Sequence, residues 1–86
     1  MSPEISLHPI PVLIDGQDRQ ASLILVEGQL TAVIVRLDSE AHPPETRGRW
    51  RLAIGFGKCN VLGPPLFATP EDAGAWVEQL LTWGAS

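Results

Sequence analysis

The most regular pattern of apolar and polar positions in the chain runs through residues 49–57. Large apolar side chains alternate there with small or basic ones, at a period of two that fits an extended strand. Burying each large side chain contributes about 1.5–3 kcal/mol, so we expect a half-buried strand whose apolar side is covered by a helix. That apolar side holds Trp50, Leu52, Ile54 and Phe56, and the other side holds Arg49, Arg51, Ala53, Gly55 and Gly57.

Two earlier segments, 21–26 and 30–37, are rich in β-forming residues and predict a hairpin around Glu27-Gly28-Gln29. With a two-residue loop, both faces of this hairpin are apolar, which is typical of strands that are covered on both sides. One face is expected to carry Leu23, Leu25, Leu30, Ala32 and Ile34, and the other Ile24, Val26, Thr31, Val33, Val35 and Leu37.

A first strand is expected around Ile10 and residues 12–14, which run into a turn signal at residues 15–18. Pro9 and Pro11 cannot donate hydrogen bonds, so this strand belongs at an edge of the sheet. Residues 1–9 are expected to form an irregular arm. Residues 39–48 carry charge, two prolines and no apolar periodicity, which predicts a mobile loop.

The C-terminal segment, residues 69–83, predicts a helix. Thr69 is suited to the N-cap and Pro70 to the first helical position, and acidic residues in the first turn oppose the positive end of the helix dipole. Gly84 is expected to end the helix. An apolar stripe at helical spacing predicts packing on the apolar side of the 49–57 strand, through Ala73, Trp76, Val77 and Leu80.

These elements predict an α+β fold in a single domain, residues 1–86: a four-stranded antiparallel meander with one C-terminal helix packed on one face. One helix covers only one face of such a sheet. The hairpin is apolar on both faces, so we expect a second copy of the chain to cover the other face, giving a homodimer.

Charge is divided unevenly along the chain, whose formal net charge is −4. All six Lys and Arg residues lie between positions 19 and 58 beside four acidic residues, whereas the flanks hold six acidic residues and no Lys or Arg. An acidic chain disfavours polyanionic partners, although a local basic face still acts within a Debye length of about 8–10 Å.

The expected location is the cytoplasm. Cys59 is the only cysteine, so no internal disulfide can form, which suits a reducing compartment. The first residues lack the basic and apolar regions of a secretory signal. Charged and glycine residues interrupt the apolar run of residues 21–37, so no membrane span is expected.

Residue patterns for catalysis or metal binding are weak, so we expect no enzyme activity, no cofactor and no metal site. Gly55-Phe56-Gly57-Lys58 fails the phosphate-loop pattern, because Leu52 stands at the first glycine position and Cys59 follows the lysine. Cys59 lacks a nearby histidine to act as its base. One cysteine and two distant histidines give no zinc-ligand spacing.

Two binding functions remain. The first is a small interaction module that self-associates through its sheet and docks a protein partner or a small ligand, through the bare sheet face or the 39–48 loop. The surplus of apolar sheet surface supports it. The second, less favoured by the acidic charge, is nucleic-acid binding through the basic side of the sheet. The candidate binding residues are Arg36, Arg49, Arg51 and Lys58.

Overall fold

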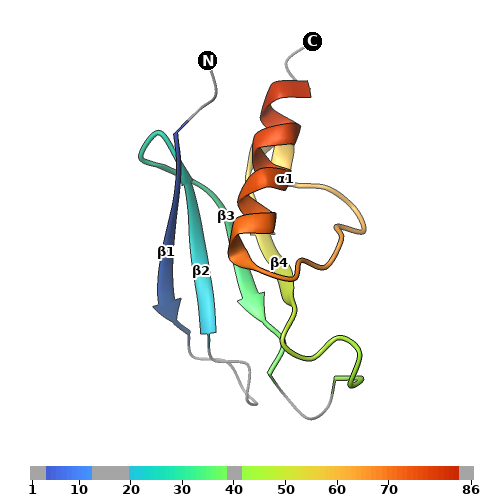
Figure 1. The fold of residues 1–86 in the computed structure, drawn as a ribbon. Coiled ribbons are helices and arrows are strands. Elements are labelled where there is room, and N and C mark those ends of the chain that lie inside the picture. Colours follow the sequence, from blue (N-terminus) through green and yellow to red (C-terminus); the bar gives the residue numbers. More distant parts are fainter. Residues whose placement is uncertain (1–3, 13–19, 39–41, 84–86) are drawn as a thin grey trace.

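The four-stranded sheet and the C-terminal helix of the predicted fold are both present in the computed structural model, which describes residues 4–12, 20–38 and 42–83 (Figure 1). All strand pairs are antiparallel, and the strands lie in the order of the sequence, which confirms the meander. The elements are β1 (Ile5–Pro11), β2 (Gln20–Val26), β3 (Gln29–Arg36), β4 (Trp50–Gly55), a short 3₁₀ helix η1 (Gly57–Cys59) and α1 (Pro70–Trp83).

Strand β1 begins earlier than the sequence pattern predicted. Residues 5–9, expected to form an irregular arm, pair with β2 from Ile5 opposite Val26 onwards. The Glu4 carbonyl accepts a hydrogen bond from the Glu27 N–H at 2.9 Å, so alternation turns the backbone groups of even-numbered residues toward β2. The backbone nitrogens of Pro9 and Pro11 therefore point away from β2, so their lack of N–H groups removes no hydrogen bond from the sheet. The expectation of an edge strand is confirmed, whereas Leu13 and Ile14 lie outside the described residues.

The β2–β3 hairpin turns at Glu27-Gly28, where both residues have positive φ (52° and 80°), as in a type I′ turn. Its register then shifts by one residue: Leu25 pairs with Leu30, but Ile24 pairs with Ala32, so Thr31 is an extra residue. Beyond such a bulge, each residue of the bulged strand lies on the face opposite to the one that simple alternation predicts. The predicted face assignment of the hairpin is therefore wrong.

The observed faces follow from this register. We call the side of the sheet that packs on α1 the helix face, and the opposite side the outer face. The helix face carries Ser22, Ile24, Val26, Ala32 and Ile34, and the outer face carries Leu23, Leu25, Val33 and Val35. Both faces of the hairpin are apolar, as predicted, but with different members.

A second bulge, in β4, makes the predicted face assignment of residues 49–57 wrong beyond Leu52. Leu52 pairs with Ile34, but Ile54 pairs with Val33, so Ala53 is the extra residue in β4. Because Val33 lies on the outer face, Ile54 does too, instead of joining Trp50 and Leu52 against the core. Ile54 is 51 % exposed and Phe56 is 49 % exposed. Half of the predicted apolar stripe therefore points away from the helix.

Helix α1 begins as predicted. The Asp72 N–H donates to the Thr69 hydroxyl at 3.1 Å, which satisfies one of the free amides of the first turn. The stripe meets the sheet through Ala73 and Val77, both fully buried, with Trp76 and Leu80 packed beside them. The predicted helix end, Gly84, lies outside the described residues.

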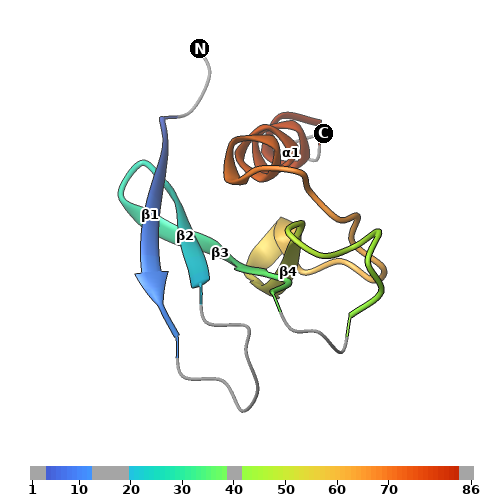
Figure 2. The same ribbon diagram turned by 60° about the horizontal axis from the view of Figure 1, so that its bottom comes forward.

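Helix α1 makes its main contacts with β1, β3 and η1, whereas the prediction placed it on the 49–57 strand, of which only Trp50 and Leu52 pack against the same core. Gly74 is buried, and a Cβ there would lie 3.4 Å from Ile5 and 3.6 Å from Leu7, so the helix approaches β1 closely. Figure 2, which shows the helix nearly end-on, places α1 on one side of the sheet. Among the described residues, no helix or strand covers the outer face.

The 3₁₀ turn that follows β4 explains why residue 55 is a glycine. Gly55 pairs with Ala32 on the helix face, and η1 folds back over it, so a Cβ at Gly55 would overlap the Cys59 carbonyl. This places Cys59, fully buried, in the core beside Phe67 and Val77.

The loop before β4 contains ordered turns in its described part, residues 42–48. The Thr46 N–H and hydroxyl both donate to the Pro43 carbonyl, at 3.0 and 2.9 Å. The Gly48 N–H donates to the Leu37 carbonyl at 2.8 Å, which ties the loop to the end of β3. The first part of the predicted loop, residues 39–41, lies outside the described residues.

Candidate functional site

The helix face is left open at one end of the sheet, because α1 packs near Ile5 and Leu7 at the start of β1. In Figure 1 the lower ends of β1 and β2 extend beyond the first turn of the helix. An open cavity of about 270 Å³ lies at this end. We call it the end cavity, and its lining residues are Pro9, Ile10, Pro11, Gln20, Ala21 and Trp50.

Strand register explains why these side chains meet. Pro11 lies opposite Gln20, and Trp50 lies opposite Arg36, so all four share the helix face in one cross-strand row. The Arg36 side chain completes the row by donating to the Gln20 amide oxygen at 3.3 Å. The backbone of Trp50 is held in turn by two hydrogen bonds with Phe67, at 2.7 and 2.9 Å.

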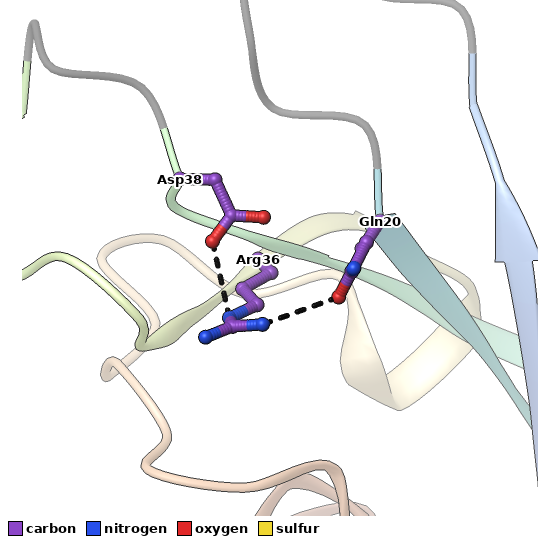
Figure 3. Close-up of polar contacts among 3 residues, drawn as sticks. All are labelled: Gln20, Arg36 and Asp38. Carbon is purple, nitrogen blue, oxygen red and sulfur yellow. Dashed lines mark hydrogen bonds and ion pairs between the residues drawn. The ribbon is translucent and has the colours of Figure 1, made fainter.

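Arg36 contacts two polar side chains at this end of the sheet (Figure 3). Its Nε lies 3.1 Å from the Asp38 carboxylate, and its Nη1 donates to Gln20. The two charged side chains are 42 % and 29 % exposed, so the ion pair stabilises the fold by little, within about 1 kcal/mol. The contacts instead fix the direction of the guanidinium beside the cavity.

The loop before β4 passes close to Arg36. Gly48 has a φ of 83°, and a Cβ there would lie 3.9 Å from Arg36 Nη2. The Arg47 Nε donates to the His42 carbonyl at 3.0 Å. Arg49 lies opposite Leu37, on the other face of the sheet from Arg36.

The outer face is the second candidate surface. Ala21, Val35 and Leu37 are buried within the chain, so this face is closed at one end. Toward the other end, Leu30 is 43 % exposed and Ile54 51 % exposed, while Leu23, Leu25 and Val33 are half-buried. The outer face therefore presents a run of apolar side chains to solvent.

The four candidate binding residues do not form a single patch. Arg51 pairs with Val35 on the outer face, and alternation places Arg49 on the same side. Arg36 points to the helix face, so it does not share one basic side of the sheet with Arg49 and Arg51. Lys58 lies in η1, beyond the opposite end of β4.

Groups suited to nucleophilic or metal chemistry are sparse in the part of the chain that the structure describes. Burial raises the pKa of the Cys59 thiol, which keeps the sulfur protonated and unreactive at neutral pH. Within residues 4–12, 20–38 and 42–83, no three His, Cys, Asp or Glu side chains gather as metal ligands would. No helix in these ranges is long and apolar enough to cross a membrane.

The end cavity was missed at the sequence level. The sequence contains the residues that line it, among them Pro9, Pro11 and Trp50, but only the register of all four strands brings these residues close together. Comparison with family models, with curated proteins and with solved structures finds no match for this chain. We therefore infer function from the geometry of the end cavity and the outer face.

Proposed function

We propose that this protein is a small, non-catalytic interaction module that self-associates through the outer face of its sheet. The observation that carries the proposal is the run of apolar side chains on that face, with Leu30 and Ile54 exposed and Leu25 and Val33 half-buried beside them. Contiguous exposed apolar surface on one sheet face is typical of an interface.

A second copy of the chain is the occupant that we propose, because its own outer face offers a matching apolar surface and isologous pairing is the commonest arrangement of homo-oligomers. Face-to-face packing of two sheets would cover the outer face, as in a sandwich.

Edge pairing is less favoured. Strand β4 is an edge strand without proline, but the outward backbone groups of Trp50 are already bonded to Phe67. The free thiol of Cys59 and the lack of any other cysteine fit the proposed cytoplasmic location.

Sedimentation velocity of one variant and its matched control tests the proposal. Ile54→Glu places a charge on the outer face, and Leu62→Glu makes the same kind of change at a fully exposed loop residue. Each dimer would bury two added carboxylates, so Ile54→Glu should weaken association by on the order of a hundredfold. Leu62→Glu should leave association unchanged. Equal sedimentation of both variants and the unmodified chain would show that the chain does not self-associate through the outer face.

Nucleic-acid binding is a second candidate, which one observation favours. The bulge at Ala53 places Ile54 on the outer face with Arg51, and continued alternation places the half-exposed ring of Phe56 on that side too. Cations beside an exposed aromatic ring are the elements of a single-strand platform. The net charge of −4 weighs against this reading.

Anisotropy of a labelled single-stranded oligonucleotide tests this candidate, at about 50 and 200 mM salt. Binding that weakens steeply with salt, and that the double change Arg49→Glu and Arg51→Glu abolishes, would support it. Absence of binding at the lower salt would exclude it. Self-association of the double variant, measured alongside, shows whether the two functions are separate.

A further inference from the structure

We propose that two copies of the chain pair through their outer faces in one orientation, in which the basic corner of each copy lies on the acidic corner of the other. The basic corner is Arg49 and Arg51, around the start of β4, and the acidic corner is Glu4, directly before β1, with Glu27 in the adjoining hairpin turn. This inference rests on the proposed self-association and adds to it the relative orientation of the two copies.

The strand register determines where these charges lie. Because Ile5 and Leu7 pack against the core under the helix, alternation places Glu4 on the outer face. The Glu4 carbonyl accepts the N–H of Glu27, so both residues lie at the hairpin end of the sheet. Arg51 is on the outer face at the other edge of the sheet, and β1 and β4 begin at opposite ends (Figure 1). The two corners are therefore diagonal to each other across the outer face.

The charges at both corners are exposed to solvent. Glu4, Glu27, Arg49 and Arg51 are all exposed, including the two arginines at the end of the outer face that the chain itself closes. Within the part of the chain that the structure describes, none of these four side chains forms an ion pair. Opposite charges attract one another within a Debye length of about 8–10 Å, so a second copy can bring a partner to each corner.

The apolar side chains of the outer face lie midway between the two corners. Two cross-strand rows separate the row of Glu4 from the row of Arg51, and both rows are mainly apolar. Their apolar members are Leu25 and Leu30 in the first row, and Leu23, Val33 and Ile54 in the second. A two-fold axis between the copies, perpendicular to the line that joins the corners, passes through these rows. Rotation about it packs the apolar rows on each other and exchanges the corners.

This arrangement crosses the strands of the two sheets at a large angle, nearer to orthogonal than to aligned packing, and we call it the crossed arrangement. An axis parallel to the strands would instead place Arg51 over the end of β1 near Ile10. An axis across the strands would place Arg51 over the far end of β4 near Phe56. Neither alternative brings an arginine onto a carboxylate, so charge complementarity selects the crossed arrangement.

Sedimentation velocity of Arg51→Glu and Glu4→Arg, each alone and as an equimolar mixture, tests the crossed arrangement. Each single variant turns both attractive contacts of the dimer into repulsive ones, so it should weaken self-association about tenfold. Glu4→Arg should do so although it reduces the net negative charge of the chain, which alone would favour association. The mixture should associate as tightly as the unmodified chain, because both contacts of a mixed pair again join opposite charges.

Lys58→Glu is the matched control for Arg51→Glu. It changes the net charge equally, but Lys58 lies in η1, which packs over the helix face, so self-association should change by less than about twofold. Unaltered association of the single variants, or a mixture that associates no more tightly than its components, overturns the crossed arrangement alone. An unmodified chain that stays monomeric overturns the proposed self-association, and the crossed arrangement with it.

Discussion

At the scale of single residues, a few backbone positions determine the shape of the sheet. Gly55 admits the Cys59 carbonyl against β4, which brings the 3₁₀ helix η1 over the core. Glu27 and Gly28 form the tight hairpin turn with positive φ at both residues. Glycine adopts such a backbone freely, but glutamate does so at a cost of about 1 kcal/mol. Glu27 is thus a point of local strain.

Replacing Glu27 by asparagine should relieve this strain. Asparagine tolerates positive φ, and Asn-Gly is the preferred pair in a type I′ turn, so Glu27→Asn should stabilise the fold by about 0.5–1 kcal/mol. Urea unfolding measures the change. Glu45→Asn, the same substitution at an exposed residue without positive φ, should alter stability by less than about 0.5 kcal/mol. A gain in both variants, or in neither, would contradict the turn argument.

The Cys59 thiol should make stability depend on pH at the alkaline end. Burial raises its pKa in the folded state, so the folded chain holds the proton more tightly than the unfolded chain. This contribution is fully present below the unfolded pKa of about 8.5 and is lost as the pH rises through the raised value. The free energy of unfolding should therefore fall more steeply above about pH 8.5 than it does in Cys59→Ala. Parallel pH profiles for the two proteins would contradict the burial of this thiol.

At the scale of elements, the sequence pattern predicts the parts of the fold that depend on neighbouring residues. The cap and stripe of α1, the hairpin at Glu27-Gly28 and the proline-bearing edge strand all follow from local spacing. The faces of β2, β3 and β4 do not, because each bulge adds one residue and reverses the alternation beyond it. The extra residues, Thr31 and Ala53, carry no distinctive local signal. The end cavity and the exposure of Ile54 are consequences of these bulges, so neither could be predicted.

The close approach of α1 to β1 gives a prediction at this scale. Gly74 lies inside the helix, where glycine is less favourable than alanine by about 0.8–1 kcal/mol. An added Cβ would make ordinary contacts with Ile5 at 3.4 Å and Leu7 at 3.6 Å. Gly74→Ala should therefore stabilise the fold by about 0.5–1 kcal/mol in thermal or urea unfolding.

A matched change at Gly63 provides the control for Gly74→Ala. Gly63 has a φ of 63°, a conformation that alanine adopts only with strain, so Gly63→Ala should destabilise the fold by about 1 kcal/mol. The two variants carry the same chemical change and are expected to move stability in opposite directions. Destabilisation by Gly74→Ala would show that the helix packs on β1 more tightly than the distances indicate.

At the scale of the whole molecule, the single helix leaves the sheet covered unequally. Val77 and Ala73 bury the helix face over the centre of the sheet, while Leu30 and Ile54 on the outer face remain exposed. The composition of the hairpin predicts that both faces need cover, and a small domain gains stability when a second subunit supplies it. The outer face is therefore the side of the molecule on which we propose self-association.

Sedimentation equilibrium of the unmodified chain at tens of micromolar tests self-association most directly, since everything proposed for the outer face depends on a second copy. We predict a mass twice that of the 9.3 kDa chain, falling toward the monomer mass on dilution. A mass of one chain throughout that concentration range would contradict it, and would show that the exposed apolar side chains of the outer face serve some purpose other than self-association.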